Sequence, residues 1–222
     1  VKVSALLEHR KRIKDSVIKL WGKIISCPII YVGYWKIMES LKSLIIYNGV
    51  NYLYPSRGAS PSVDSFGLAY FASKTAKGNC VDLCSGAGLI SLLMIKKYSI
   101  SRSTCIDIDS DSCRLCLQNF HDNSVLNECN VINVDVKDIK STGLSESFDF
   151  CITNPPYHTE DKKASSARSE IFCSLNDVIS AAFYLLKNRG RFFVSMKTER
   201  LSGWIRPLKR FWEKKRKYLE TK

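Results

Sequence analysis

The sequence predicts an α/β domain whose mostly parallel sheet is covered by helices on both faces. From about residue 79 to residue 196, short apolar runs alternate with stretches of helical periodicity. Strands that alternate with helices of about ten residues indicate a parallel sheet, because a crossover is needed to reach a parallel neighbour. A glycine-rich turn follows the first expected strand, and an acidic or amide side chain ends each of the next three. Ligands of such sheets bind at the carboxyl ends of the strands.

Each element of the domain follows from this alternation. The residues expected to form strands are 80–83, 103–108, 131–134, 148–153 and 191–196, and those expected to form helices are 89–98, 111–120 and 175–186. After the fifth strand, residues 199–217 have the pattern of another helix, and residues 217–221 offer one short strand at most.

The amino-terminal segment is expected to be a separate extension. Residues 2–25 place apolar side chains at helical spacing with basic ones among them, which is typical of a basic amphipathic helix. The apolar stretch 24–35 contains Pro28 and is shorter than the roughly 20 residues that a membrane span needs, so no stable span is expected. The helix is expected to pack against the domain, with a membrane surface or a targeting role as the alternatives. We therefore divide the chain into a helical extension, residues 1–48, and an α/β domain, residues 49–222.

Composition and cysteine usage indicate a folded protein of a reducing compartment. Apolar residues make up 45% of the 222 residues and charged residues 25%. The nine cysteines are an odd number and several lie inside apolar runs, which favours core positions over a disulfide framework and places the protein in the cytoplasm. Cys113 and Cys116 form a C-x-x-C pair, but no second pair follows at zinc-ligand spacing, so core packing is favoured over a metal site.

The net charge of +13 is concentrated at the two ends of the chain. Residues 1–25 hold seven basic and two acidic residues, and residues 197–222 hold ten and three. Basic ends on a neutral centre fit an anionic macromolecule, most simply a nucleic acid held through its phosphates. A solvated surface that only improves solubility is the alternative.

The turn after the first strand has the features of a cofactor loop. Asp82 lies in this strand, and Gly86 and Gly88 close the turn before the next helix. Without a Cβ the backbone can approach a ligand closely, and the amino terminus of a helix favours a carboxylate such as that of S-adenosylmethionine. A structural turn or a dinucleotide site would use the same glycines.

Acids at the ends of the next two strands fit a nucleoside. Asp107 can accept hydrogen bonds from two ribose hydroxyls, which an NAD-type cofactor would use equally well. Asp109 is expected to cap the following helix. Asp135 can accept a hydrogen bond from an adenine amine, with a simple loop acid as the alternative.

The fourth strand leads into Asn154-Pro155-Pro156-Tyr157, the most specific signal of the sequence. The prolines fix φ and remove backbone donors, so the Asn154 oxygen and the following carbonyl can both accept from an NH2 group. Such an amine would be held with its lone pair aimed at a methyl donor, and Tyr157 offers a face for a planar substrate.

Together these motifs resemble the class I S-adenosylmethionine-dependent methyltransferases that modify amino groups, over about residues 50–201. Within that class the chain is most similar to the bacterial tRNA adenine-37 N6-methyltransferases that modify a valine tRNA. Local similarities are the Asp-Leu-Cys-Ser-Gly form of the loop, the sequence Ser62-Val63-Asp64-Ser65, and Ala167-Arg168-Ser169-Glu170. Members of that family usually have histidine where Ser169 stands.

The resemblance implies a Rossmann-like fold, S-adenosyl-L-methionine as cofactor and RNA as partner. The implied cofactor-binding residues are Asp82, Gly86, Gly88, Asp107 and Asp135, and the implied catalytic and substrate-binding residues are Asn154, Pro155, Tyr157 and Arg168. The class normally adds a helix and two closing strands after the fifth strand, so this sheet is expected to lack its final strands.

Three other functions compete with this one. A methyltransferase for a glutamine of release factors uses the same Asn-Pro-Pro-Tyr motif, but has a longer segment between it and the fifth strand. A DNA adenine methyltransferase would usually carry an extra recognition domain. A non-catalytic RNA-binding module could keep the fold without turnover.

Overall fold

The computed structural model describes residues 41–46, 49–55, 60–155, 173–196 and 201–220. The chain divides into two compact units, Val1–Ser60 and Pro61–Lys222. The basic helix expected at residues 2–25 lies outside the described residues. Among the described helices, none is long and apolar enough to cross a membrane.

The described part of the first unit is a β-hairpin. Strand β1 (Leu41–Ile45) pairs antiparallel with β2 (Asn51–Pro55), so that Leu41 lies opposite Pro55. The rings of Tyr52 and Tyr54, two residues apart on one face of β2, stack at 6.1 Å between centroids. The boundary expected between residues 48 and 49 falls between β1 and β2.

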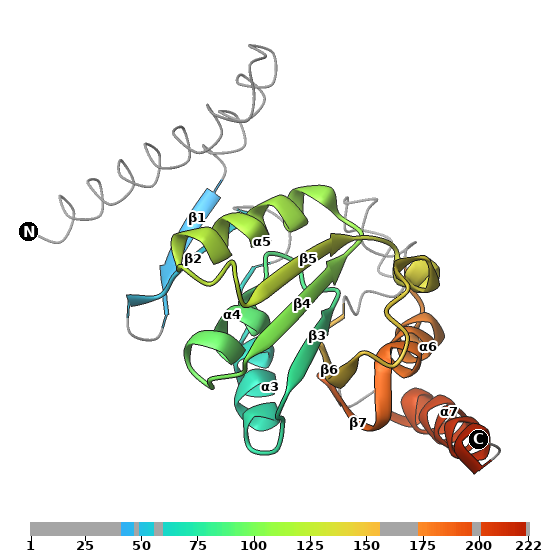
Figure 1. Cartoon of the computed structure of the whole chain (residues 1–222). Helices are drawn as coiled ribbons and strands as arrows, with labels where there is room; N and C mark the ends of the chain where they lie inside the picture. Colours follow the sequence, from blue (N-terminus) through green and yellow to red (C-terminus); the bar gives the residue numbers. More distant parts are fainter. Residues whose placement is uncertain (1–40, 47–48, 56–59, 156–172, 197–200, 221–222) are drawn as a thin grey trace, which may run out of the picture. The chain divides into compact units, whose positions relative to one another are not determined.

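The second unit contains a five-stranded sheet in which all neighbouring strands are parallel (Figure 1). Its strands are β3 (Asn79–Leu83), β4 (Arg102–Asp107), β5 (Cys129–Asn133), β6 (Phe148–Thr153) and β7 (Leu186–Val194). The strand order is β5-β4-β3-β6-β7. The chain thus starts in the middle, moves outward through β4 and β5, and returns to the other side of β3.

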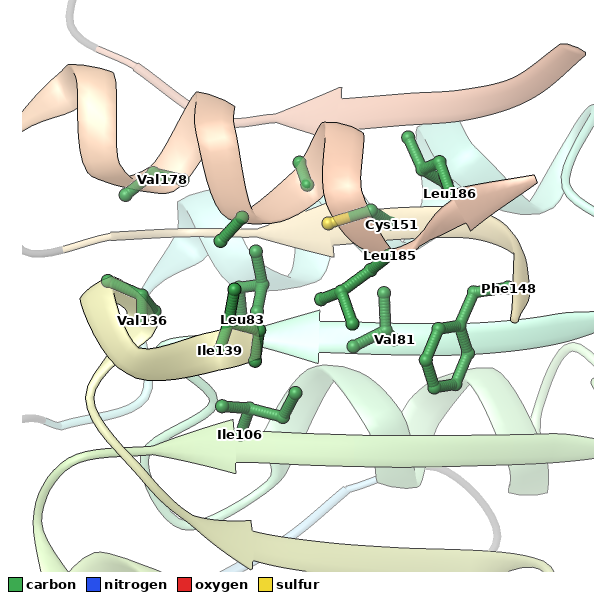
Figure 2. Close-up of a cluster of buried hydrophobic side chains, with 12 residues drawn as sticks. Val81, Leu83, Ile106, Val136, Ile139, Phe148, Cys151, Val178, Leu185 and Leu186 are labelled. Carbon is green, nitrogen blue, oxygen red and sulfur yellow. The ribbon is translucent and has the colours of Figure 1, made fainter. Parts of the chain in front are cut away.

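Helices cover both faces of this sheet. The α-helices are α3 (Val63–Ser73), α4 (Leu89–Lys96), α5 (Ser110–Asp122), α6 (Leu175–Leu185) and α7 (Leu201–Glu220), and η2 (Val136–Thr142) is a 3-10 helix. Side chains alternate along β3, so Val81 and Leu83 face the opposite side from Asp82. Figure 2 shows Val81 and Leu83 against α6 and η2, in a cluster of buried side chains. Asp82 reaches α4 on the other face, where it bonds to Ser91.

The parallel sheet and its helices confirm the predicted fold class, and the predicted elements agree with the observed ones to within a few residues. Asp109 caps α5 as predicted, with its carboxylate accepting from the Ser112 amide at 3.1 Å. Cys80, Cys105, Cys116 and Cys151 are completely buried, as expected for core residues.

Two differences concern the carboxyl-terminal part. The last strand of the sheet, β7, begins at Leu186, five residues before the predicted start. The sequence analysis missed these residues because Lys187–Gly190 is polar and has no apolar pattern. A register shift between Phe148 and Phe150 accommodates this stretch. The helix α7 continues to Glu220. Residues 217–220 are therefore helical, although the sequence analysis considered a short strand at residues 217–221.

The helix α7 packs on α6 through aromatic rings. Phe183 stacks on Phe211 at 5.8 Å between centroids and meets Trp212 edge to face at 6.5 Å. Such pairs stabilise beyond the area that they bury, by about 0.5–1.5 kcal/mol each. The basic carboxyl-terminal helix is therefore anchored to the α/β unit at Phe183.

Candidate active site

The ends of β3 and β6 lie side by side at the carboxyl edge of the sheet. β3 and β6 are parallel neighbours, and Leu83 lies opposite Thr153 at the end of the pairing. The Thr153 hydroxyl donates to the Leu83 carbonyl at 2.7 Å. Because the chain turns in opposite directions from these two strands, their ends form the topological switch point of the sheet, where such folds bind ligands.

Backbone geometry shapes the loop after β3. Cys84, Gly86 and Gly88 all have positive φ, at 56°, 54° and 82°. The Ser85 amide donates to the Ile106 carbonyl at 3.2 Å, and the Gly88 amide donates to the Ser85 carbonyl at 3.0 Å. The loop is thereby closed on itself and fixed to the end of β4.

The two glycines of this loop have different surroundings. A Cβ added at Gly86 would meet no atom within 4 Å, so this position borders open space. A Cβ added at Gly88 would lie 2.5 Å from the Cys116 sulfur and 3.1 Å from the Phe120 ring. Gly86 therefore offers backbone that a ligand could approach, whereas Gly88 is the N-cap of α4 and allows α5 to pack closely against it.

Asp107 links the second strand to this loop. Its Oδ2 accepts from the Gly86 amide at 2.7 Å, and its Oδ1 accepts from the Asp109 amide at 2.9 Å. Burial raises the pKa of Asp107, and the two amide donors oppose that rise because they favour the carboxylate. The carboxylate is only partly buried and retains further lone pairs for a ligand.

The neighbouring strand end is organised by Asn133 and Asp135. The Asn133 amide donates to the carbonyls of Asp107 and Ile108, both at 2.9 Å. Asp135 caps η2 by accepting from the Lys137 amide at 2.9 Å. Asp135 is therefore a helix cap, and it lies at the same edge of the sheet as Asp107, because the ends of β4 and β5 are paired.

Asp82 is buried beneath the loop rather than exposed in it. Only 1% of its surface is accessible, and its Oδ2 accepts from the amide and the hydroxyl of Ser91 at 3.2 and 2.9 Å. The Ser91 hydroxyl also lies 2.7 Å from that of Ser103 and 3.1 Å from the Cys105 sulfur. Burial raises the pKa of Asp82 to about 7, against the effect of the Ser91 hydrogen bonds. The Asp82 carboxyl, with its hydrogen bonds to Ser91, therefore supports the loop after β3 from inside the protein.

Asn154 is held by two serines from the start of α3. Its Nδ2 donates to Ser65 Oγ at 3.0 Å and more weakly to Ser62 Oγ at 3.4 Å. Ser62 caps α3 by accepting from the Ser65 amide, and the two hydroxyls are 3.1 Å apart. If the Ser65 hydroxyl donates to Ser62, its lone pairs are left for the Asn154 amide nitrogen. In this orientation no described residue donates to the Asn154 oxygen, which can accept from a ligand.

The structure thus brings together most of the residues that the sequence predicted, in two roles. Gly86, Asp107 and Asn154 lie at the open carboxyl edge with Asp135 near them, whereas Asp82 and Gly88 are buried supports. Pro155 follows Asn154 and is buried. The predicted substrate residues Tyr157 and Arg168 lie outside the described residues, as do His158, Lys162 and Lys163.

Four supporting residues were not singled out for a role by the sequence analysis: Ser65, Ser91, Ser103 and Asn133. Ser91 and Ser103 lie in apolar surroundings and are buried, and a polar residue within an apolar run is the signal that could have identified them. Asn133 interrupts the apolar run 131–134 in the same way, whereas Ser65 carries no such signal.

The parallel sheet with its switch-point site defines a Rossmann-like methyltransferase fold, and solved structures share it. The structure of M. jannaschii TYW2 in complex with AdoMet matches with a TM-score of 0.57 at 16% identity, covering 79% of this chain and 73% of that one. A putative methyltransferase, SMU.776, complexed with SAH, matches with a TM-score of 0.56 at 16% identity, covering 76% and 46%.

The sequence identifies the family within this fold. The model of the methyltransferase small domain matches residues 66–209, and the chain belongs to that family. A tRNA1(Val) (adenine(37)-N6)-methyltransferase of Shewanella baltica (strain OS185) is 30% identical over 108 residues, which are 48% of this chain and 45% of that protein. One of Flavobacteriaceae bacterium (strain 3519-10) is 27% identical over 129 residues, 57% and 54% of the two chains. The chain thus matches about half the length of these curated relatives.

The two glycines allow a test of their different roles. Alanine at either position adds strain of about 1–2 kcal/mol, because an L-residue disfavours the left-handed region. Gly88→Ala should lower the free energy of unfolding by about a further 1–3 kcal/mol, because the new methyl overlaps the Cys116 sulfur. Urea unfolding of both variants measures the difference. Equal destabilisation would contradict the packing role of Gly88.

The buried carboxyl of Asp82 should make stability depend on pH. Its pKa is raised in the folded state, so the folded protein keeps a proton that the unfolded chain releases, and stability decreases as pH rises. Between pH of about 4 and about 7 the loss should approach 1.4 kcal/mol per pH unit. Asp82→Asn cannot ionise and should remove this contribution. Denaturation at pH 5, 6, 7 and 8 compares the two proteins, and parallel curves would show that Asp82 ionises in the native state as in the unfolded one.

Proposed function

We propose that the protein transfers a methyl group from S-adenosylmethionine to the exocyclic amine of an adenine in RNA, and that this RNA is a tRNA. The observation that carries the proposal is the orientation of Asn154 directly after β6: its amide nitrogen donates to Ser65, and no described residue donates to its oxygen. Family membership and the names of the curated relatives support the reaction and the RNA substrate. We place the protein in the cytoplasm.

The residues at the carboxyl edge fit the proposed cofactor. Asp107 is a partly buried carboxylate with free lone pairs, which suits the ribose hydroxyls. Gly86 borders open space in front of the amino terminus of α4, where a carboxylate is favoured. Asp135 would accept from the adenine amine. In this proposal Asp82 and Gly88 act as supports of the loop. The bound cofactor supplies an electrophilic methyl group.

The proposed chemistry at the target amine is positioning. The Asn154 oxygen and the Pro155 carbonyl would each accept one hydrogen of the NH2 group, which directs its lone pair toward the methyl group. The amine loses its proton after transfer, so no general base is required. Tyr157 as a stacking face and Arg168 as a phosphate contact enter the proposal from the sequence alone.

Cofactor binding tests the role of Asp107. Asp107→Ala would leave the ribose hydroxyls without a charged acceptor, which should weaken S-adenosylmethionine binding by about 1.5–3 kcal/mol. Asp109→Ala is the matched control, because it removes the cap of α5 two residues away and should cost about 1 kcal/mol of stability without a change in affinity. Calorimetry measures both. An affinity of Asp107→Ala equal to that of the wild type would exclude Asp107 from the cofactor site.

Turnover tests the orientation of Asn154. Asn154→Ala should lower kcat about a hundredfold or more and leave cofactor affinity nearly unchanged, because the interaction is made mainly in the transition state. Asn154→Asp keeps an acceptor and should retain partial activity. Ser65→Ala frees the amide to rotate, which should lower kcat about fivefold to tenfold, the equivalent of one hydrogen bond. Ser65→Thr retains the hydroxyl and should restore turnover.

Nucleoside mass spectrometry of bacterial tRNA treated with protein and labelled cofactor provides the assay. Equal methylation by the wild type and Asn154→Ala would overturn the mechanism. No methylated adenine with any tRNA, together with cofactor binding, would instead favour the glutamine methyltransferase. If the protein neither methylates tRNA nor binds the cofactor, the non-catalytic RNA-binding module would be favoured.

A further inference from the structure

A cavity lined by cations lies at the amino edge of the sheet, opposite the candidate active site. It measures about 500 Å³ and is bordered by residues that precede β3, by the start of β6 and by β7. Its charged lining consists of five cations and one acid: Lys74, Lys77, Lys187, Arg189, Arg191 and Asp149. The cations come from two segments more than a hundred residues apart, so the fold creates this concentration of charge.

The single acid is already matched. Asp149 accepts from the Lys187 ammonium at 2.8 Å and from the Asn79 amide at 2.8 Å. Both donors lower the pKa of Asp149, which is therefore ionised and balances Lys187. The remaining four cations have no carboxylate among the lining residues.

Two of these cations are held at the wall of the cavity. The Arg191 guanidinium donates to the Thr75 carbonyl, and the Lys74 ammonium lies 4.2 Å from the centroid of the Tyr70 ring. Lys77 and Arg189 form no salt bridge with a described residue. Arg189 also has a φ of 62°, an unfavourable conformation for a residue other than glycine. Cations that outnumber the acids around one cavity repel one another, and a bound anion relieves that repulsion.

We propose that this cavity binds consecutive phosphates of the RNA backbone. Several cations around one cavity suit a row of charges better than one small anion. The aromatic ring of the lining, Phe150, is 1% exposed, so it offers no stacking face for a base. The cavity would therefore contact the backbone and contribute affinity without base selectivity.

The distance between the cavity and the carboxyl edge sets a minimum length for the RNA that could contact both. The strands that separate it from the carboxyl edge have five or six residues, which correspond to about 17–20 Å. An RNA that reaches both edges must extend across the sheet, as a folded tRNA can and a mononucleotide cannot. This step rests on the proposed function, because it takes the substrate of the carboxyl edge to be RNA.

Binding of unfractionated bacterial tRNA, measured by fluorescence anisotropy without cofactor at several salt concentrations, tests the proposal. Lys77→Gln/Arg189→Gln should weaken binding about tenfold at low salt and lower the slope of log K against log salt by about two, one for each lost phosphate contact. Arg114→Gln/Lys140→Gln is the matched control, because it removes the same charge from exposed cations outside the cavity. Thermal unfolding checks that all variants fold.

Three outcomes decide the matter. The phosphate site is supported if only the cavity variant loses affinity for tRNA and has a smaller slope of log K against log salt. In a methylation assay the same variant should then have a higher KM for tRNA and an unchanged kcat. The proposal is overturned if the cavity variant binds tRNA with the same affinity as the wild type or as the control variant. Weaker binding to phosphatidylglycerol vesicles with unchanged tRNA binding would also overturn it, in favour of a membrane surface. Because the binding assay needs no turnover, its result stands even if no tRNA is methylated.

Discussion

The parallel pairing of β3 with β6 is the constraint on which the site depends. It places Leu83 opposite Thr153, 70 residues later in the chain, and the Thr153 hydroxyl fixes the two strand ends together. The glycine-rich loop and Asn154 are neighbours only because of this pairing. The connections of the sheet leave β3 and β6 in opposite directions, so the space between their ends is not covered by a crossover. The fold therefore creates an open position between Asn154 and the loop after β3, whose backbone is fixed by hydrogen bonds to the end of β4.

Beneath that position the protein buries polar groups rather than a continuous apolar layer. Asp82, Ser91, Ser103 and Cys105 bond to one another between β3, β4 and α4. One oxygen of Asp82 has no partner among the described residues, and burial raises its pKa to about 7. A buried carboxyl without a cation is costly unless it is protonated. Because Asp82 lies beneath the loop after β3, the stability of that loop depends on whether the Asp82 carboxyl is protonated.

Charge is distributed unequally between the two edges of the sheet. Asp107, Asp109 and Asp135 follow the strands at the carboxyl edge, whereas lysines and arginines surround the amino edge around Asp149. The net charge of +13 gives no sign of this division. It arises because the segments 74–77 and 187–191 lie at the starts of β3 and β7, the two strands that flank β6.

The sequence alone determined the five strands of the parallel sheet, the helices α4, α5, α6 and α7, and the likeness to amino methyltransferases, because hydrophobic periodicity, caps and the Asn-Pro-Pro-Tyr motif are local patterns. Only the tertiary structure decided the roles of residues whose partners are distant. It separated Gly86, which borders open space, from Gly88, which packs against Cys116 and Phe120. It buried Asp82, and it brought Ser65 to Asn154 across 89 positions of the chain. No local pattern contains such contacts, since they depend on the order in which strands pair and on which face each helix covers.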